Sequence, residues 1–128
     1  MNINVFNPLP GGGSSNSLPF RILIPTRVEL SVGGFSISSG TQYVKLKTRV
    51  IDAMTGQTIY GIGHRYIYTY FYLDRRYIGM SRVNQSGTDA GYSVISYKAK
   101  TGAHLAKAVY NEDEKYGGSQ VEIQFTAP

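Results

Sequence analysis

Few residues in this 128-residue sequence have the chemistry that catalysis requires. The two histidines, His64 and His104, are the obvious candidates for acid–base work, but no serine lies in a nucleophile motif that would complete a triad. His104 shares a strand face with Ala106 and Ala108, which favours a core or edge histidine. Cysteine is absent, so disulfides and thiolate chemistry are excluded. The sequence therefore predicts a protein that is not an enzyme.

Metal and phosphate sites have equally little support. The acidic residues Glu112, Asp113 and Glu114 could hold calcium weakly, although a solvated loop is the more ordinary explanation of three adjacent acids. A tighter metal site needs at least three clustered ligands. The glycine run at 11–13 lacks the lysine and the helix of a phosphate-binding loop. We expect no cofactor and no metal.

The strongest functional pattern in the sequence is its tyrosines. The chain has eleven tyrosines and no tryptophan, and several tyrosines alternate with other residues along one segment. Tyrosine offers rigid contact area with a polar hydroxyl, a combination that protein interfaces favour. We interpret one face of this segment as an interface, with a tyrosine-rich core and a solvent-facing tyrosine ladder as alternatives. The alternating tyrosines are Tyr66, Tyr68, Tyr70 and Tyr72, and the opposite face carries Ile67, Thr69, Phe71 and Leu73.

A basic stripe lies on another segment. Lys45, Lys47 and Arg49 share one face of a predicted strand, and Tyr43 extends that face. Basic residues interleaved with tyrosines can bind single-stranded nucleic acid. The net charge is +5, but the thirteen basic residues are scattered and no run exceeds two. A solvated face that protects the sheet against aggregation is therefore the preferred interpretation, and nucleic acid is not an expected partner.

The elements that must position these residues are predicted as β-strands. Polar turn sequences, several with glycine, separate the alternating segments. About seven evenly spaced strands without helical patterns between them are typical of an antiparallel sandwich or barrel. The predicted strands cover residues 26–32, 43–51, 65–73, 77–83, 92–99, 103–110 and 120–125.

Several pieces of the chain follow a known order. They are a strand ending at Asp52, a Thr-Gly turn at 55–56, a Thr-Asp-Ala-Gly segment at 88–91, an alternating strand at 102–110, and an acidic loop followed by Tyr116 and Ser119. In order and spacing, residues 42–126 resemble the immunoglobulin-like domains of prokaryotic surface proteins and virus particles. The resemblance implies an all-β, antiparallel immunoglobulin-like β-sandwich of about seven strands. It implies no activity, because such sandwiches host many functions.

The first 25 residues differ from the rest in composition. Prolines at 8 and 10 and the Gly-Ser-rich run at 11–17 are typical of turns and linkers. Apolar residues flank this linker, and a segment that serves only as a spacer does not need them. We predict an extended N-terminal arm over 1–25 and a sandwich over 26–128. The arm residues predicted to contact a partner are Ile3, Val5, Phe6, Leu18 and Phe20.

The N-terminus does not have the pattern of a cleaved secretion signal. It lacks a basic start and an apolar stretch of signal-peptide length, and no window approaches the roughly 20 apolar residues of a membrane span. We expect a protein of a virus particle or an extracellular surface, without a membrane span.

Three functional hypotheses follow, in order of preference. A subunit of a larger assembly, such as a virion decoration, adaptor or tail protein, accounts for the arm, the missing signal and the tyrosine strand. Its partners would be further copies of the chain or other structural proteins. A cell-surface adhesion or glycan-binding module accounts for the fold and the tyrosines, but leaves the arm unexplained. A nucleic-acid-binding β-domain accounts for the positive charge alone.

Overall fold

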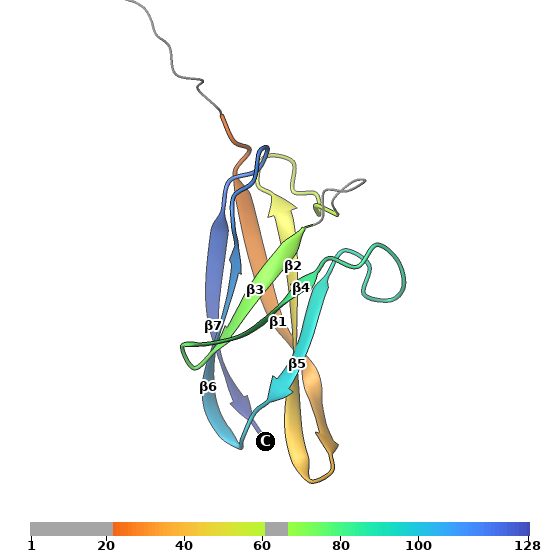
Figure 1. The fold of residues 1–128 in the computed structure, drawn as a ribbon, viewed down its shortest axis with the longest axis vertical. Coiled ribbons are helices and arrows are strands. Elements are labelled where there is room, and N and C mark those ends of the chain that lie inside the picture. Colours follow the sequence, from red (N-terminus) through yellow and green to blue (C-terminus); the bar gives the residue numbers. More distant parts are fainter. Residues whose placement is uncertain (1–21, 61–66) are drawn as a thin grey trace, which may run out of the picture.

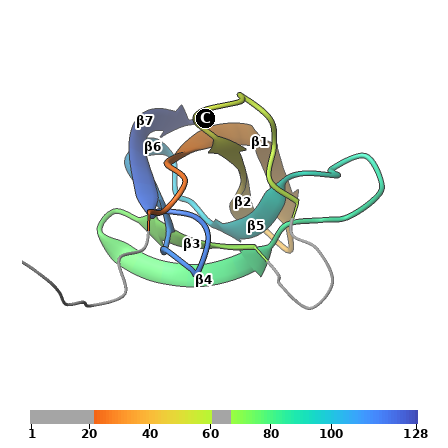
Figure 2. The same ribbon diagram turned by 90° about the horizontal axis from the view of Figure 1, so that it is seen from above.

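The computed structural model describes residues 22–60 and 67–128, whose strands form two antiparallel sheets (Figure 1). The two sheets face each other across a shared interior (Figure 2). One sheet has the order β1-β2-β5, built from β1 (Thr26–Ser38), β2 (Thr41–Asp52) and β5 (Ser93–Lys98). The other has the order β4-β3-β6-β7, built from β3 (Tyr68–Leu73), β4 (Arg76–Arg82), β6 (Gly102–Tyr110) and β7 (Ser119–Ala127). The predicted all-β antiparallel sandwich is confirmed.

The strands are divided between the two sheets in a fixed pattern. The first, second and fifth strands lie in one sheet, and the third, sixth and seventh lie in the other. β4 pairs with β3 and adds a fourth strand to the second sheet. At the open sides β1 approaches β7 and β5 approaches β4, so the sheet edges lie near one another (Figure 2).

The core lies between the sheets because each strand turns its apolar residues to the same side. On β2, Val44, Leu46 and Val50 are fully buried, and the lysines between them are not. Phe71 on β3 is the largest fully buried side chain, and burial of a phenylalanine stabilises a fold by about 2–3 kcal/mol. Ala108 is paired with Phe71 on the neighbouring strand, and its small side chain leaves room for the ring.

β1 continues beyond the glycines that we predicted would end it. The prediction stopped at Val32, whereas the strand runs to Ser38 with a register shift between Val32 and Gly34. Gly34 has a φ of 132°, a conformation that favours glycine. The two glycines therefore form a bulge within one strand, after which pairing with β2 resumes.

The end of the predicted arm lies against the β6–β7 loop. The Ile24 N–H donates to the Lys115 carbonyl at 2.9 Å, and the Gly117 N–H donates to the Ile24 carbonyl at 2.8 Å. Residues 1–21 and 61–66 lie outside the described ranges. These segments include six predicted interface residues: Ile3, Val5, Phe6, Leu18, Phe20 and Tyr66.

Candidate functional site

The tyrosines of β3 lie on the outer face of the four-stranded sheet. The core-facing residues of β3 are Thr69, Phe71 and Leu73, all buried. The outer-facing residues are Tyr68, Tyr70 and Tyr72, all half-buried. The alternative of a tyrosine-rich core is therefore wrong for these three residues.

Strand β4 adds two exposed residues that the sequence analysis did not single out. Tyr77 is 51% exposed and Met80 is 52% exposed. In the β3–β4 register, Met80 is paired with Tyr70 and Tyr77 with Tyr72. The Tyr77 ring centre lies 5.6 Å from that of Tyr72, edge-on, and 6.3 Å from that of Tyr70. We name this group the tyrosine surface, defined by Tyr68, Tyr70, Tyr72, Tyr77 and Met80.

A β-bulge makes the tyrosine surface continuous across both strands. Residues 77 and 80 would point to opposite faces of a regular strand, because side chains alternate with a period of two. The register shift at this point of the β3–β4 ladder resets the alternation. Gly79 supplies the bulge with a φ of 143°, and a Cβ there would lie 2.8 Å from Cδ1 of Ile95. The backbone conformation thus favours glycine at this position, and any larger residue would also have to displace the end of the Ile95 side chain.

Charged side chains border the tyrosine surface. The Lys107 ammonium on β6 lies 5.5 Å from the ring centre of Tyr72, within range of a cation–π contact. Arg82 is paired with Tyr68 in the β3–β4 register, and Glu122 with Lys107 in the β6–β7 register. An aromatic centre with a charged rim is the usual anatomy of a protein–protein interface.

The basic residues of the stripe on β2 are each paired with an acid of the same chain. Asp89 lies 3.0 Å from the Lys47 ammonium and 3.5 Å from that of Lys45. Its hydrogen bond to Lys47, with the charge of Lys45, lowers the pKa of Asp89 below its usual value although partial burial opposes this. Arg49 pairs with Glu29 at 2.8 Å. A nucleic acid would have to displace these pairs, so this face gives no support to the nucleic-acid hypothesis.

The two ring nitrogens of His104 each lie beside a hydrogen-bond acceptor. Its Nδ1 lies 2.7 Å from Asp74 Oδ2, and its Nε2 lies 2.6 Å from the Lys100 carbonyl oxygen. A neutral ring carries one N–H, so two acceptors require the imidazolium. The hydrogen bond to Lys100, and then that to Asp74, raises the pKa of His104. The pair fastens the β3–β4 turn to β6, because Asp74 Oδ1 also accepts from the Leu105 N–H at 2.9 Å.

The acidic loop does not form a metal site. Asp113 Oδ1 accepts from the N–H groups of Lys115 and Tyr116, and Oδ2 accepts from the Tyr110 hydroxyl. No group of three or more metal-ligating side chains occurs among residues 22–60 and 67–128. The same ranges contain no helix long and apolar enough to cross a membrane.

Comparisons with known proteins do not assign the chain to a family. No protein-family model matches it, and searches of curated proteins and of solved structures give no significant match. The tyrosine surface and the charged residues around it are therefore the features of this chain that indicate a function.

Proposed function

We propose that this protein is a non-enzymatic interaction protein, a subunit of a larger assembly that contacts its neighbours through the tyrosine surface. The observation that carries the proposal is the exposure of Tyr77 and Met80 beside three half-buried tyrosines on one sheet face. Large aromatic and methionine side chains are enriched in the buried centres of protein interfaces. Scattered exposed hydrophobics are ordinary, but a contiguous group with a charged rim marks a contact surface.

The arm is the second element of this proposal. Its apolar residues flank a Gly-Ser-rich linker, so they can reach a neighbouring subunit while the sandwich stays in place. An extended segment can add a strand to the sheet edge of a partner. The sequence residues that would make these contacts are Ile3, Val5, Phe6, Leu18 and Phe20.

The resemblance to immunoglobulin-like domains of virus particles and surface proteins suggests the setting. We place the protein in a virion, as a decoration, adaptor or tail component, or at an extracellular surface. Its partners are further copies of itself or other structural proteins. A glycan-binding role on the same tyrosines is the competing function, because sugars also stack on aromatic rings.

Point variants of the tyrosine surface test the proposal. Tyr77→Lys places a charge in the centre of the surface, and Met54→Lys is its matched control, since Met54 is 74% exposed and lies in the turn after β2. The native mass of each full-length variant is measured by light scattering at moderate salt. We expect assembly of the wild type and of Met54→Lys, and loss of assembly with Tyr77→Lys.

Two results would count against this function. Equal masses for wild type and Tyr77→Lys at every concentration would remove the tyrosine surface from self-assembly. A monomeric wild type that binds glycans through Tyr77 would replace the assembly function with the glycan-binding one. Deletion of residues 1–21 further distinguishes the assembly function from the glycan-binding function, because it should weaken assembly and leave sugar binding intact.

A further inference from the structure

The two ends of the sandwich carry opposite charge among the described residues. The end formed by the β2 terminus and the β6–β7 loop has four acids, Asp52, Glu112, Asp113 and Glu114, against one base, Lys115. The other end has four bases, Arg75, Arg76, Lys98 and Lys100, against one acid, Asp74, besides the imidazolium of His104. Lys98 and Lys100 precede the start of β6, and the acidic loop follows its end at Tyr110; the nine residues of β6 span roughly 26 Å at the usual rise. The β3–β4 turn with Arg75 and Arg76 lies between them, beside the middle of β6, where Leu73 pairs with Ala106.

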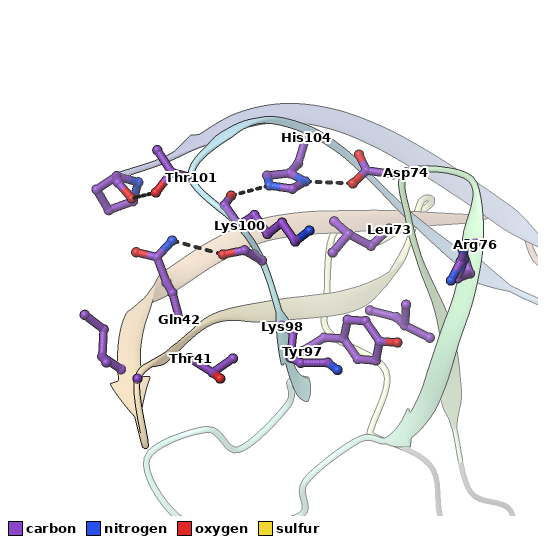
Figure 3. A pocket seen from close by; sticks show the side chains of 15 residues that line it. Thr41, Gln42, Leu73, Asp74, Arg76, Tyr97, Lys98, Lys100, Thr101 and His104 are labelled. Atoms are coloured by element: carbon purple, nitrogen blue, oxygen red, sulfur yellow. Dashed lines mark hydrogen bonds and ion pairs between the residues drawn. The ribbon is translucent and has the colours of Figure 1, made fainter.

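The basic end is concave. A cleft of about 900 Å³ opens between the sheets there, and its floor is formed by Leu73, Ile78 and Tyr97. Figure 3 shows Arg76, Lys98 and Lys100 among the side chains that surround it. None of these three cations forms an ion pair with a described residue.

The one acid of the cleft does not cancel this charge. Asp74 is occupied by His104 and by the Leu105 N–H (Figure 3). Partial burial of Asp74 raises its pKa, but the hydrogen bonds from the Leu105 N–H and from His104 outweigh this effect and lower the pKa below its usual value. A carboxylate at Pro128 would still leave the cleft positive.

The acidic end is a convex loop with a fixed shape. The β6–β7 loop projects beyond the sheets at the end opposite the C-terminus (Figure 1). The Asp113 N–H donates to the Tyr116 carbonyl at 3.0 Å, and the carboxylate of Asp113 accepts three further hydrogen bonds within the loop. Glu112 and Glu114 are exposed beside it. A loop that is ordered before binding loses little conformational entropy on association.

We propose that the acidic β6–β7 loop of one copy binds in the basic cleft of a second copy, so that subunits join head to tail. The charges are complementary, a convex element meets a concave one, and both are present on every chain. Since the two contacting surfaces differ, each bound subunit leaves one free end, and the contact repeats into a ring or an open filament. This contact uses different residues from the tyrosine surface and does not depend on it.

Charge reversal tests the contact in the full-length chain. Glu112→Lys alters the loop and Lys100→Glu alters the cleft, and each should raise the Kd of self-association about tenfold or more at low salt. The double variant Glu112→Lys/Lys100→Glu restores opposite charges and should regain association. An equimolar mixture of the two single variants should do the same. Light scattering at about 20 mM and about 300 mM salt measures the masses, and the higher salt should weaken the contact by screening.

Controls separate this contact from a general charge effect and from the tyrosine surface. Glu29→Lys changes the net charge as Glu112→Lys does, but lies on the outer face of β1. It breaks the exposed ion pair with Arg49, which contributes little to stability, so the variant should stay folded in urea titrations and keep the low-salt mass of the wild type. Tyr77→Lys should retain the salt-sensitive association. A wild type that stays monomeric at about 20 mM salt and millimolar concentration overturns the proposal. So does a double variant that associates no better than the single ones.

Discussion

Replacing His104 by phenylalanine should destabilise the fold in a pH-dependent way. The substitution keeps the ring that stacks on Phe125 at 5.4 Å but removes the hydrogen bonds to Asp74 and Lys100. Hydrogen bonds to charged groups contribute about 1.5–3 kcal/mol each. Asp74 is 51% exposed, so solvent screening reduces its share, and we expect a loss of about 2 kcal/mol in total.

The pH dependence follows from the raised pKa of His104 in the folded state. Below the ordinary histidine value of about 6.5, the ring is protonated in both the folded and the unfolded chain, and the stabilisation is fully present. As the pH rises through the higher folded-state pKa, the ring loses its second proton and the stabilisation declines. The difference in unfolding free energy between wild type and His104→Phe should therefore be largest near pH 5.5 and shrink in alkaline solution.

Urea unfolding at a series of pH values between 5 and 10 measures this difference. At typical urea sensitivities a loss of about 2 kcal/mol lowers the midpoint by about 1 M. The other histidine, His64, is present in both proteins, so its titration cancels in the comparison. A difference that is independent of pH, or that grows as the pH rises, would refute the assignment of an imidazolium between two acceptors.

Three further predictions concern the packing that positions the tyrosine surface, and urea unfolding measures each of them. Gly79→Ala should lower the unfolding free energy by about 1–3 kcal/mol, because residue 79 has a positive φ and Ile95 Cδ1 lies close to it. Ile95→Val removes that methyl group, so the double variant should lose less stability than the sum of the two single losses. Strictly additive losses would show that the contact between residues 79 and 95 does not matter. Thr69→Val should stabilise the fold by about 1 kcal/mol, since the buried Thr69 hydroxyl has no hydrogen-bond partner among residues 22–60 and 67–128; destabilisation would reveal a partner. Phe71→Ala should cost about 3–5 kcal/mol. Tyr77→Ala should cost only about 1 kcal/mol, because the half-exposed ring loses its contacts with Tyr70 and Tyr72. Similar costs for the two would contradict their placement in the core and at the surface.

The strands could be predicted from the sequence because the alternation that indicates a strand lies within that strand. Alternation along residues 43–51 and 103–110 reflects a period of two that holds within each strand. The prediction at Gly33 and Gly34 was wrong because a glycine pair can end a strand or form a bulge within it. Only pairing with β2 distinguishes the two outcomes.

The candidate site was predictable only in part, because its second half depends on pairing between strands. The alternation on β3 indicated a tyrosine face but could not show which side was buried. Tyr77 and Met80 are three residues apart, a spacing that in a regular strand places them on opposite faces. The bulge at Gly79 brings them to one face, and its only trace in the sequence is the glycine itself.

The features at the two ends of the sandwich were even harder to predict from the sequence. Asp74 and His104 are 30 residues apart in the chain, and their contact depends on the pairing of β3 with β6. The acidic residues of the β6–β7 loop were interpreted as solvated. Their position opposite a basic cleft follows from strand direction and the closure of the sheets, which local patterns do not encode.

Oxidation of the methionines tests most directly whether the tyrosine surface is a contact surface. Met80 lies in the surface and Met54 lies outside it, and the two are 52% and 74% exposed in the single chain. Mild peroxide converts exposed methionine to its sulfoxide, which mass spectrometry of peptides quantifies. When the full-length protein is concentrated at moderate salt, Met80 should become protected relative to dilute protein, while Met54 should continue to oxidise at its dilute rate. Equal oxidation of Met80 in concentrated and dilute protein would show that the tyrosine surface is not a contact surface.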